Sequence, residues 1–215
     1  APPARPGAPG SAEASPAAGE ALPARTYAEV HAYLDLHPCE CGSAQFPRGD
    51  MAVLEAGDAG VVVGYAGPCD GCARPRKFTF RLPARPGVPP AAPFRFSYPE
   101  DGPSQLLDAA QWLDVADGYT FFCDQVAARS GAPGAFTDPA EREEMQKCLT
   151  AAASAVDEVL KFLPPGAKRV PAGALWSEQS QARYAADRAA FERRRLTQRQ
   201  TDRWRALTEF TNRYG

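Results

Sequence analysis

Four of the six cysteines lie in two short segments, and their positions constrain the fold more than any other feature of the chain. The segment HPCECG holds Cys39 and Cys41, and the segment PCDGC holds Cys69 and Cys72. The 27 residues between Cys41 and Cys69 leave room for a hairpin that brings the two pairs together. Structural Zn2+ takes four soft ligands at about 2.3 Å in a tetrahedron. The spacing therefore predicts one metal site that joins two distant segments of the chain.

The residues between and after the cysteine pairs have the pattern of β-strands. Residues 51–57 (MAVLEAG) and 60–67 (GVVVGYAG) are strand-like runs that a two-residue turn separates, with glycine on both sides of the turn. Residues 77–83 (KFTFRLP) place large apolar side chains at alternate positions, which is typical of a strand with one buried face. Residues 94–98 (FRFSY) alternate in the same way and are expected to return to this sheet as a further strand.

This order of cysteine pair, hairpin, cysteine pair and strand resembles a zinc ribbon, a small antiparallel β-module of the rubredoxin-like kind, over residues 37–82. The resemblance implies a structural Zn2+ held by Cys39, Cys41, Cys69 and Cys72. Four thiolates fill the coordination shell and leave no position for a reactive water, so a structural role is favoured over a catalytic one.

The first cysteine pair departs from the usual Cys-x-x-Cys-Gly of ribbons, because a single residue separates Cys39 from Cys41. Three alternatives to a four-cysteine zinc site therefore stay open. His37 with Cys41 can replace the first pair and leave Cys39 outside the coordination shell. The cysteines can form disulfides in an exported form of the protein, or the site can hold iron.

The expected fold class is α+β, with a small antiparallel zinc-ribbon β-module followed by an all-helical domain of three or four helices. Residues 1–24 contain six prolines and no aromatic or β-branched residue, which predicts a disordered Pro/Ala-rich tail. Residues 25–98 form the zinc-ribbon module, opened by a short helix that Thr26 and Glu29 cap. Residues 99–215 form the helical domain.

Apolar residues recur at helical spacing in three stretches of this domain. The first stripe runs over residues 112–126, and a second helix begins at Asp138-Pro139 and ends before Pro164. The third region covers residues 177–214, with a bend or a division into two helices expected at residues 193–198, where the phase of the aromatic residues changes.

Several other residues that can carry chemistry receive a structural interpretation. Cys123 and Cys148 occupy apolar helical positions, where a cysteine behaves as a small buried hydrophobe. Three acidic residues of one helix, which hint at cation binding, are interpreted as a solvated face: Asp114, Asp117 and Asp124.

The two histidines, His31 and His37, both lie near the first cysteine pair, which argues against a histidine-dependent catalytic triad elsewhere in the chain. The sequence does not decide whether the protein is an enzyme, and a non-enzymatic role is favoured. The favoured function is a non-enzymatic zinc-binding adaptor that binds another, unidentified protein.

The alternative is a nucleic-acid-binding protein that uses the ribbon and the Arg-rich C-terminal helix. Residues 183–205 hold eight arginines, including Arg193, Arg194 and Arg195, with aromatic residues between them. The formal net charge of −2 argues against attraction of the whole chain to nucleic acid or to a membrane. Cysteines that lie close together in sequence are typical of metal ligands in a reducing compartment, so a cytoplasmic location is expected. No membrane partner is expected.

Overall fold

The chain has a mixed fold with one four-stranded sheet and five α-helices in the residues that the computed structural model describes. It divides into two compact units near residue 88. We call the described residues before this point the sheet unit and those after it the helical unit. The described residues are 21–49, 51–84, 95–99, 101–129 and 136–214.

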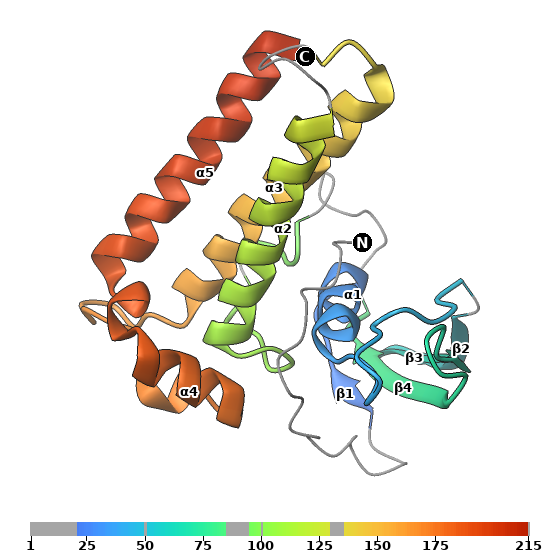
Figure 1. Ribbon diagram of the computed structural model, residues 1–215. Helices are drawn as coiled ribbons and strands as arrows, with labels where there is room; N and C mark the ends of the chain where they lie inside the picture. Colours follow the sequence, from blue (N-terminus) through green and yellow to red (C-terminus); the bar gives the residue numbers. More distant parts are fainter. Residues whose placement is uncertain (1–20, 50, 85–94, 100, 130–135, 215) are drawn as a thin grey trace. The chain divides into compact units, whose positions relative to one another are not determined.

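The sheet unit is built on four strands in the order β1-β4-β3-β2 (Figure 1). The strands are β1 (Leu22–Pro23), β2 (Ala52–Gly57), β3 (Gly60–Pro68) and β4 (Pro75–Leu82). β2, β3 and β4 pair antiparallel, whereas β1 runs parallel to β4. The predicted hairpin and the strand that follows it are therefore confirmed.

The short strand β1 lies in the segment that was expected to be a disordered tail. Leu22 pairs with Phe80, and the backbone N–H of Ala24 donates to the carbonyl oxygen of Arg81 at 2.9 Å. The last residues of the expected tail thus belong to the sheet, because a two-residue strand needs no hydrophobic run of its own when β4 supplies its partners. Residues 1–20 of the same expectation lie outside the described residues.

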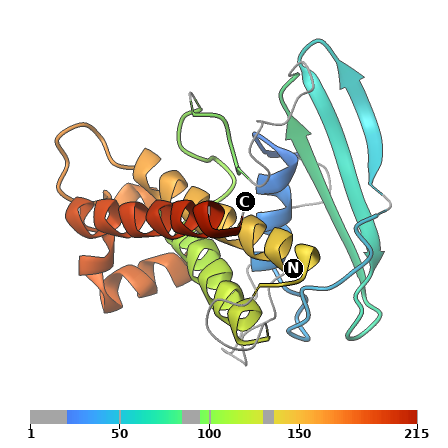
Figure 2. The same ribbon diagram turned by 90° about the horizontal axis from the view of Figure 1, so that it is seen from above.

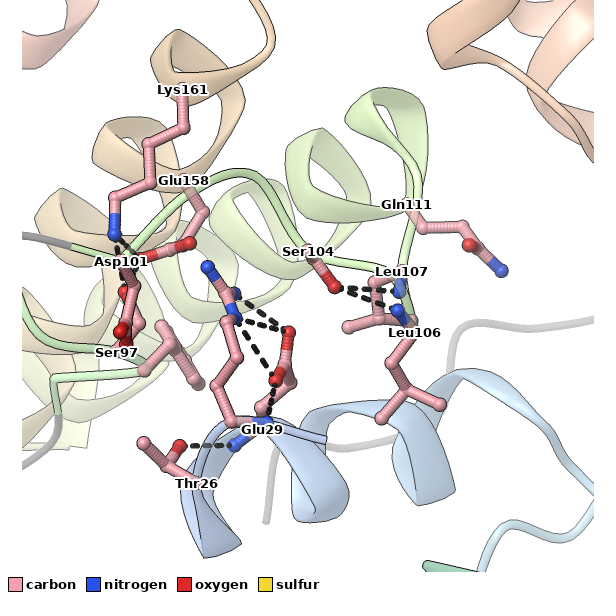
Figure 3. A network of polar contacts seen from close by, with 12 residues as sticks. Thr26, Glu29, Ser97, Asp101, Ser104, Leu106, Leu107, Gln111, Glu158 and Lys161 are labelled. Atoms are coloured by element: carbon pink, nitrogen blue, oxygen red, sulfur yellow. Dashed lines mark hydrogen bonds and ion pairs between the residues drawn. The ribbon is translucent and has the colours of Figure 1, made fainter. Parts of the chain in front are cut away.

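Helix α1 (Tyr27–Leu36) begins where the sequence predicts. The hydroxyl of Thr26 accepts a hydrogen bond from the backbone N–H of Glu29 at 3.1 Å (Figure 3). The Glu29 carboxylate accepts from the backbone N–H of Arg25 at 2.6 Å and pairs with its guanidinium. Both contacts satisfy groups at the first helical turn, which fixes the direction in which the chain enters α1.

The apolar face of α1 packs on one face of the sheet (Figure 2). The ring of Tyr33 makes edge contacts with Phe78 and Phe80 of β4, at centroid distances of 6.3 and 5.6 Å. Val63 of β3 lies opposite Phe80 and is fully buried with it. The alternation in β4 therefore fills a core between α1 and the sheet.

The expectation of a strand at residues 94–98 is wrong. The described residues 95–99 are irregular and belong to the helical unit, where Phe96 contacts Trp112 at a centroid distance of 4.9 Å. Lys161 ion-pairs with the buried Glu158 at 3.2 Å (Figure 3). It also donates to the carbonyl oxygen of Tyr98 at 3.0 Å. Alternating aromatic residues predicted a sheet face, but the buried ring of Phe96 packs against a helix instead.

The helical unit contains three long helices that run alongside one another, with α3 contacting both α2 and α5 (Figure 1). No helix in the described part of the chain is both long and apolar enough to cross a membrane. The helices are α2 (Ala109–Arg129), α3 (Pro139–Lys161), α4 (Glu178–Ala186) and α5 (Arg193–Tyr214), with short 3-10 turns at η1 (Ala172–Ala174) and η2 (Arg188–Phe191).

The predicted division of the last helical region into two helices is confirmed, but the break lies before residue 193 and not at 193–198. Asp187 ends α4, and its carboxylate accepts from the backbone N–H groups of Ala189 and Ala190 at 3.1 and 3.2 Å. Phe191, fully buried, then contacts Tyr184. A side-chain cap and a buried aromatic residue therefore decide the position of the break.

Cys123 of α2 and Cys148 of α3 are buried as predicted, but the structure joins them in a disulfide. Their interpretation as two separate hydrophobes is therefore wrong. The bond joins two residues 25 positions apart in the sequence and links the two helices beside Val126 and Met145. Sequence spacing gave no signal for this pair, because the contact arises only when α2 and α3 pack together.

Candidate metal centre

The sheet unit brings the sulfur atoms of Cys39, Cys41, Cys69 and Cys72 within 4.8 Å of one another. The closest sulfur pairs are Cys39 with Cys72 and Cys41 with Cys69, both at 3.5 Å. Sulfur atoms about 2.3 Å from a tetrahedral zinc ion lie about 3.8 Å apart. The cluster therefore has dimensions that suit a metal ion, and it is compatible with a zinc-ribbon-like site.

Two hydrogen-bonded turns hold the cysteine pairs in place. In the first turn, the backbone N–H of Cys39 donates to the carbonyl oxygen of Ser43 at 2.8 Å. In the second, which connects β3 to β4, the N–H of Cys69 donates to the carbonyl oxygen of Arg74 at 2.8 Å. A further bond, from the N–H of Asp70 to the carbonyl oxygen of Gln45 at 3.0 Å, joins the second turn to the segment after the first. These backbone bonds place the two cysteine pairs on neighbouring turns.

Two glycines make these turns possible, for different reasons. Gly42 has a φ of +88°, a conformation that other residues adopt only with strain. A Cβ on Gly71 would lie 3.1 Å from the sulfur of Cys41 and 3.0 Å from the Cβ of Ser43. The absence of a side chain at Gly71 therefore lets the second turn approach the first.

His37 lies next to the cluster but is engaged elsewhere. Its Nδ1 is 2.8 Å from the carbonyl oxygen of Tyr33, and its ring stacks on the Tyr33 ring at a centroid distance of 3.7 Å. Among the described residues, the group of possible metal ligands consists of the four cysteines, without either His37 or His31. This geometry favours the four-cysteine alternative over the one that includes His37.

The thiols of Cys69 and Cys72 have pKa values shifted in opposite directions. Burial raises the pKa of Cys69, but hydrogen bonds from the backbone of Gly71 and Cys72 and from neighbouring thiols outweigh it and lower that pKa to about 6. For Cys72, a backbone hydrogen bond from Arg74 lowers the pKa, but burial and the three other thiols raise it to about 12. Close thiols resist joint ionisation unless a cation replaces their protons. A divalent metal ion supplies that cation.

The acidic residues of α2 that were interpreted as a solvated face do not all face solvent. Arg183 of α4 pairs with both Asp114 and Asp117, the latter at 2.7 Å, and Arg199 of α5 pairs with Asp117. Asp124 is exposed. Ion pairs between helices therefore account for Asp114 and Asp117, and the solvated-face interpretation applies to Asp124.

The three consecutive arginines at the start of α5 also differ from one another. The guanidinium of Arg193 donates to the carbonyl oxygens of Ala167 and Pro164, both at 2.7 Å, whereas Arg194 and Arg195 are exposed. Arg193 thus stabilises the segment that follows α3, and the basic surface of this turn consists of Arg194 and Arg195.

Searches with the whole chain against protein-family models, curated proteins and solved structures gave no match.

Proposed function

We propose that this chain is a non-enzymatic zinc-binding protein, in which a structural Zn2+ held by Cys39, Cys41, Cys69 and Cys72 stabilises a ribbon-like module that binds another protein. The observation that carries the metal assignment is the approach of four sulfur atoms from two separate turns to within 4.8 Å. Four thiolates are soft ligands that suit zinc and exclude calcium and magnesium. A full shell of protein ligands supports a structural role.

The edge strand β2 supports the proposed role in protein interaction. Among the described strands, β2 lies at one edge of the sheet (Figure 1), and all six of its residues are exposed. Val53 and Leu54 are 57% and 56% exposed, although both are large apolar residues. Edge strands of monomeric proteins usually carry charged residues, proline or β-bulges that prevent pairing. β2 has one charged residue, Glu55, and a register shift between Val53 and Glu55.

This edge suits one kind of occupant, an extended segment of a partner protein that adds to the sheet as a further strand. Backbone groups of β2 would supply hydrogen bonds, and Val53 and Leu54 would supply apolar contacts. The segment would be apolar at alternate positions and would carry no excess of negative charge, because Glu55 and Asp58 lie at this edge.

Nucleic-acid binding remains the second candidate, and the exposed Arg194 and Arg195 favour it. Two other arginines of α5 argue against it. Arg193 is bound to backbone carbonyl oxygens and Arg199 to Asp117, so neither is available for a phosphate without loss of a contact within the helical unit.

The cytoplasmic location is a prediction that depends on the clustered cysteines being reduced. The disulfide between Cys123 and Cys148 points the other way, since such bonds persist mainly in oxidising compartments. Rapid alkylation of thiols in intact cells distinguishes the two. Free Cys123 and Cys148 support the cytoplasm, and an intact bond supports export.

Zinc analysis of the purified, reduced protein tests the metal assignment. We expect one zinc per chain in the wild type and a loss of most of it in Cys69→Ser, because three sulfur ligands bind far more weakly than four. The matched control replaces the cysteines outside the cluster, Cys123→Ser with Cys148→Ser, and should keep its zinc. A metal-free wild type, or disulfides among the four clustered cysteines, would disprove the assignment.

A further inference from the structure

Arg76 of β4 is a buried cation beside the four cysteines. Only 8% of the surface of Arg76 is exposed. Its guanidinium lies over the rings of Phe46 and Phe78, at 4.8 and 4.9 Å from their centroids. The guanidinium also donates to two backbone carbonyl oxygens, that of Ala44 at 3.3 Å and that of His37. These contacts hold the charged group in place between the core of the sheet unit and the first cysteine turn.

Arg76 has no carboxylate partner among the described residues, which distinguishes it from two neighbouring arginines. Arg48 pairs with Asp35 at 2.8 Å, and the exposed Arg74 pairs with Glu40. The contacts of Arg76 are to neutral carbonyl oxygens and aromatic rings. A buried charge without a counter-charge is strongly destabilising, so the cation requires a negative group nearby.

The clustered cysteines are the groups that can supply this negative charge. The guanidinium bonds the carbonyl oxygens of His37, two residues before Cys39, and of Ala44, three residues after Cys41, which places it beside the first cysteine turn. Burial lowers the pKa of Arg76, and the charges of Cys39, Cys69 and Cys41 oppose that shift. Four protonated thiols, or two disulfides, would be neutral and would leave Arg76 uncompensated. A zinc ion with four thiolates has a net charge of −2, because the four negative charges exceed the two positive ones.

We propose that Arg76 is the counter-ion of the metal-bound cysteine cluster, and that it raises the affinity of the site for a divalent ion by neutralising half of the net charge of the tetrathiolate complex. This inference rests on the proposed zinc site. It adds a residue that does not touch the metal but favours the charged, metal-bound state over the neutral, metal-free one.

The experiment compares zinc affinity in the full-length protein, by competition with a chromophoric chelator at constant pH and salt. Arg76→Met removes the charge and keeps an unbranched apolar stem over the rings. It should bind zinc about 10- to 100-fold more weakly, which is the usual range for groups that support metal ligands. Arg76→Lys restores the charge and should recover most of the affinity.

Arg48→Gln is the matched control, because it removes an arginine near the cluster that has its own carboxylate. It should stay within about three-fold of the wild type, since the pair is neutral as a whole. A wild type that binds no zinc would refute the proposed function. A zinc-binding wild type that Arg76→Met matches in affinity would refute the role of Arg76 alone.

The lysine variant also separates charge from shape. If Arg76→Met fails to fold even with excess zinc while Arg76→Lys folds and binds zinc, the positive charge is what the site requires, and the proposal stands. If Arg76→Lys loses affinity as severely as Arg76→Met, the hydrogen bonds to His37 and Ala44 are what matter, and the proposal is overturned.

Discussion

At the scale of single residues, Asp117 concentrates the electrostatic contacts of the helical unit. Its carboxylate binds Arg183 of α4 and Arg199 of α5, so one side chain of α2 connects three helices. Burial raises the pKa of Asp117, but the hydrogen bonds and positive charges of Arg199 and Arg183 outweigh it and lower the pKa below its usual value. A carboxyl group whose pKa falls on folding stabilises the folded state when it is ionised.

Asp117→Asn should therefore lower the free energy of unfolding at neutral pH by about 1–3 kcal/mol. The difference from the wild type should be complete above the pKa of the unfolded chain, near 4, and should disappear as the pH falls through the lower pKa of the folded state. Urea unfolding at several pH values, followed by circular dichroism, measures it. Asp124→Asn, on the exposed face of the same helix, is the control. Equal stability of Asp117→Asn and wild type at pH 7 would contradict the assignment.

The candidate site shows what single residues reveal in a sequence. The four cysteines were predictable because each pair is local and one hairpin can unite them. Arg76 was missed, although a signal existed. It lies two residues before Phe78 and four before Phe80, so it shares their buried face of β4. A charged residue in the apolar phase of a strand predicts a buried cation. Its proposed partner, however, is a set of thiols that includes Cys39 and Cys41, which lie in a distant part of the sequence.

At the scale of helices and strands, a prediction from the sequence was correct where neighbouring residues determine the local structure. The cap of α1, the hairpin of β2 and β3, and the start of α3 at Asp138-Pro139 all follow from neighbouring residues. The expected strand at 94–98 failed because alternation describes which side chains are buried and not what buries them. β1 was missed because two residues carry no periodicity.

The edge strand β2 leads to a prediction about binding. Changing Val53 and Leu54 together to lysine should preserve the fold, since both side chains are exposed, and should abolish binding of the partner that wild-type protein captures from nuclease-treated native extracts. In the wild-type complex, amide exchange should slow along β2. Phe121→Lys, which changes an exposed aromatic residue of α2, should bind normally.

Three outcomes would contradict strand addition by a partner protein. If the lysine variant captures the same protein, β2 is not the binding site. If nuclease treatment removes the captured material, the nucleic-acid alternative is favoured. If the wild type is a dimer and the lysine variant a monomer, the edge pairs with a second copy of the chain.

At the scale of the whole molecule, each unit has its own cross-link. The sheet unit has the proposed zinc site, and the helical unit has the disulfide. Removal of the metal by a chelator should unfold the sheet unit, because structural zinc contributes on the order of 10 kcal/mol to such modules. Most of the helical circular dichroism should remain, since α1 is the only described helix in the sheet unit. Complete loss of helical signal on chelation would show that the two units unfold as one.

Reduction of the disulfide should affect the helical unit instead. It should lower the stability of the helical unit by about 3 kcal/mol and leave zinc bound.

The disulfide also has a consequence for how the chain matures. Six free thiols can pair completely in roughly 15 ways, and about three of these contain the bond between Cys123 and Cys148. If zinc occupies the cluster first, only Cys123 and Cys148 remain free, and a single pairing is left. The metal would then act as a protecting group during synthesis. Zinc supply at the time of folding, more than the oxidant, would determine how much of the protein reaches the correctly bonded form.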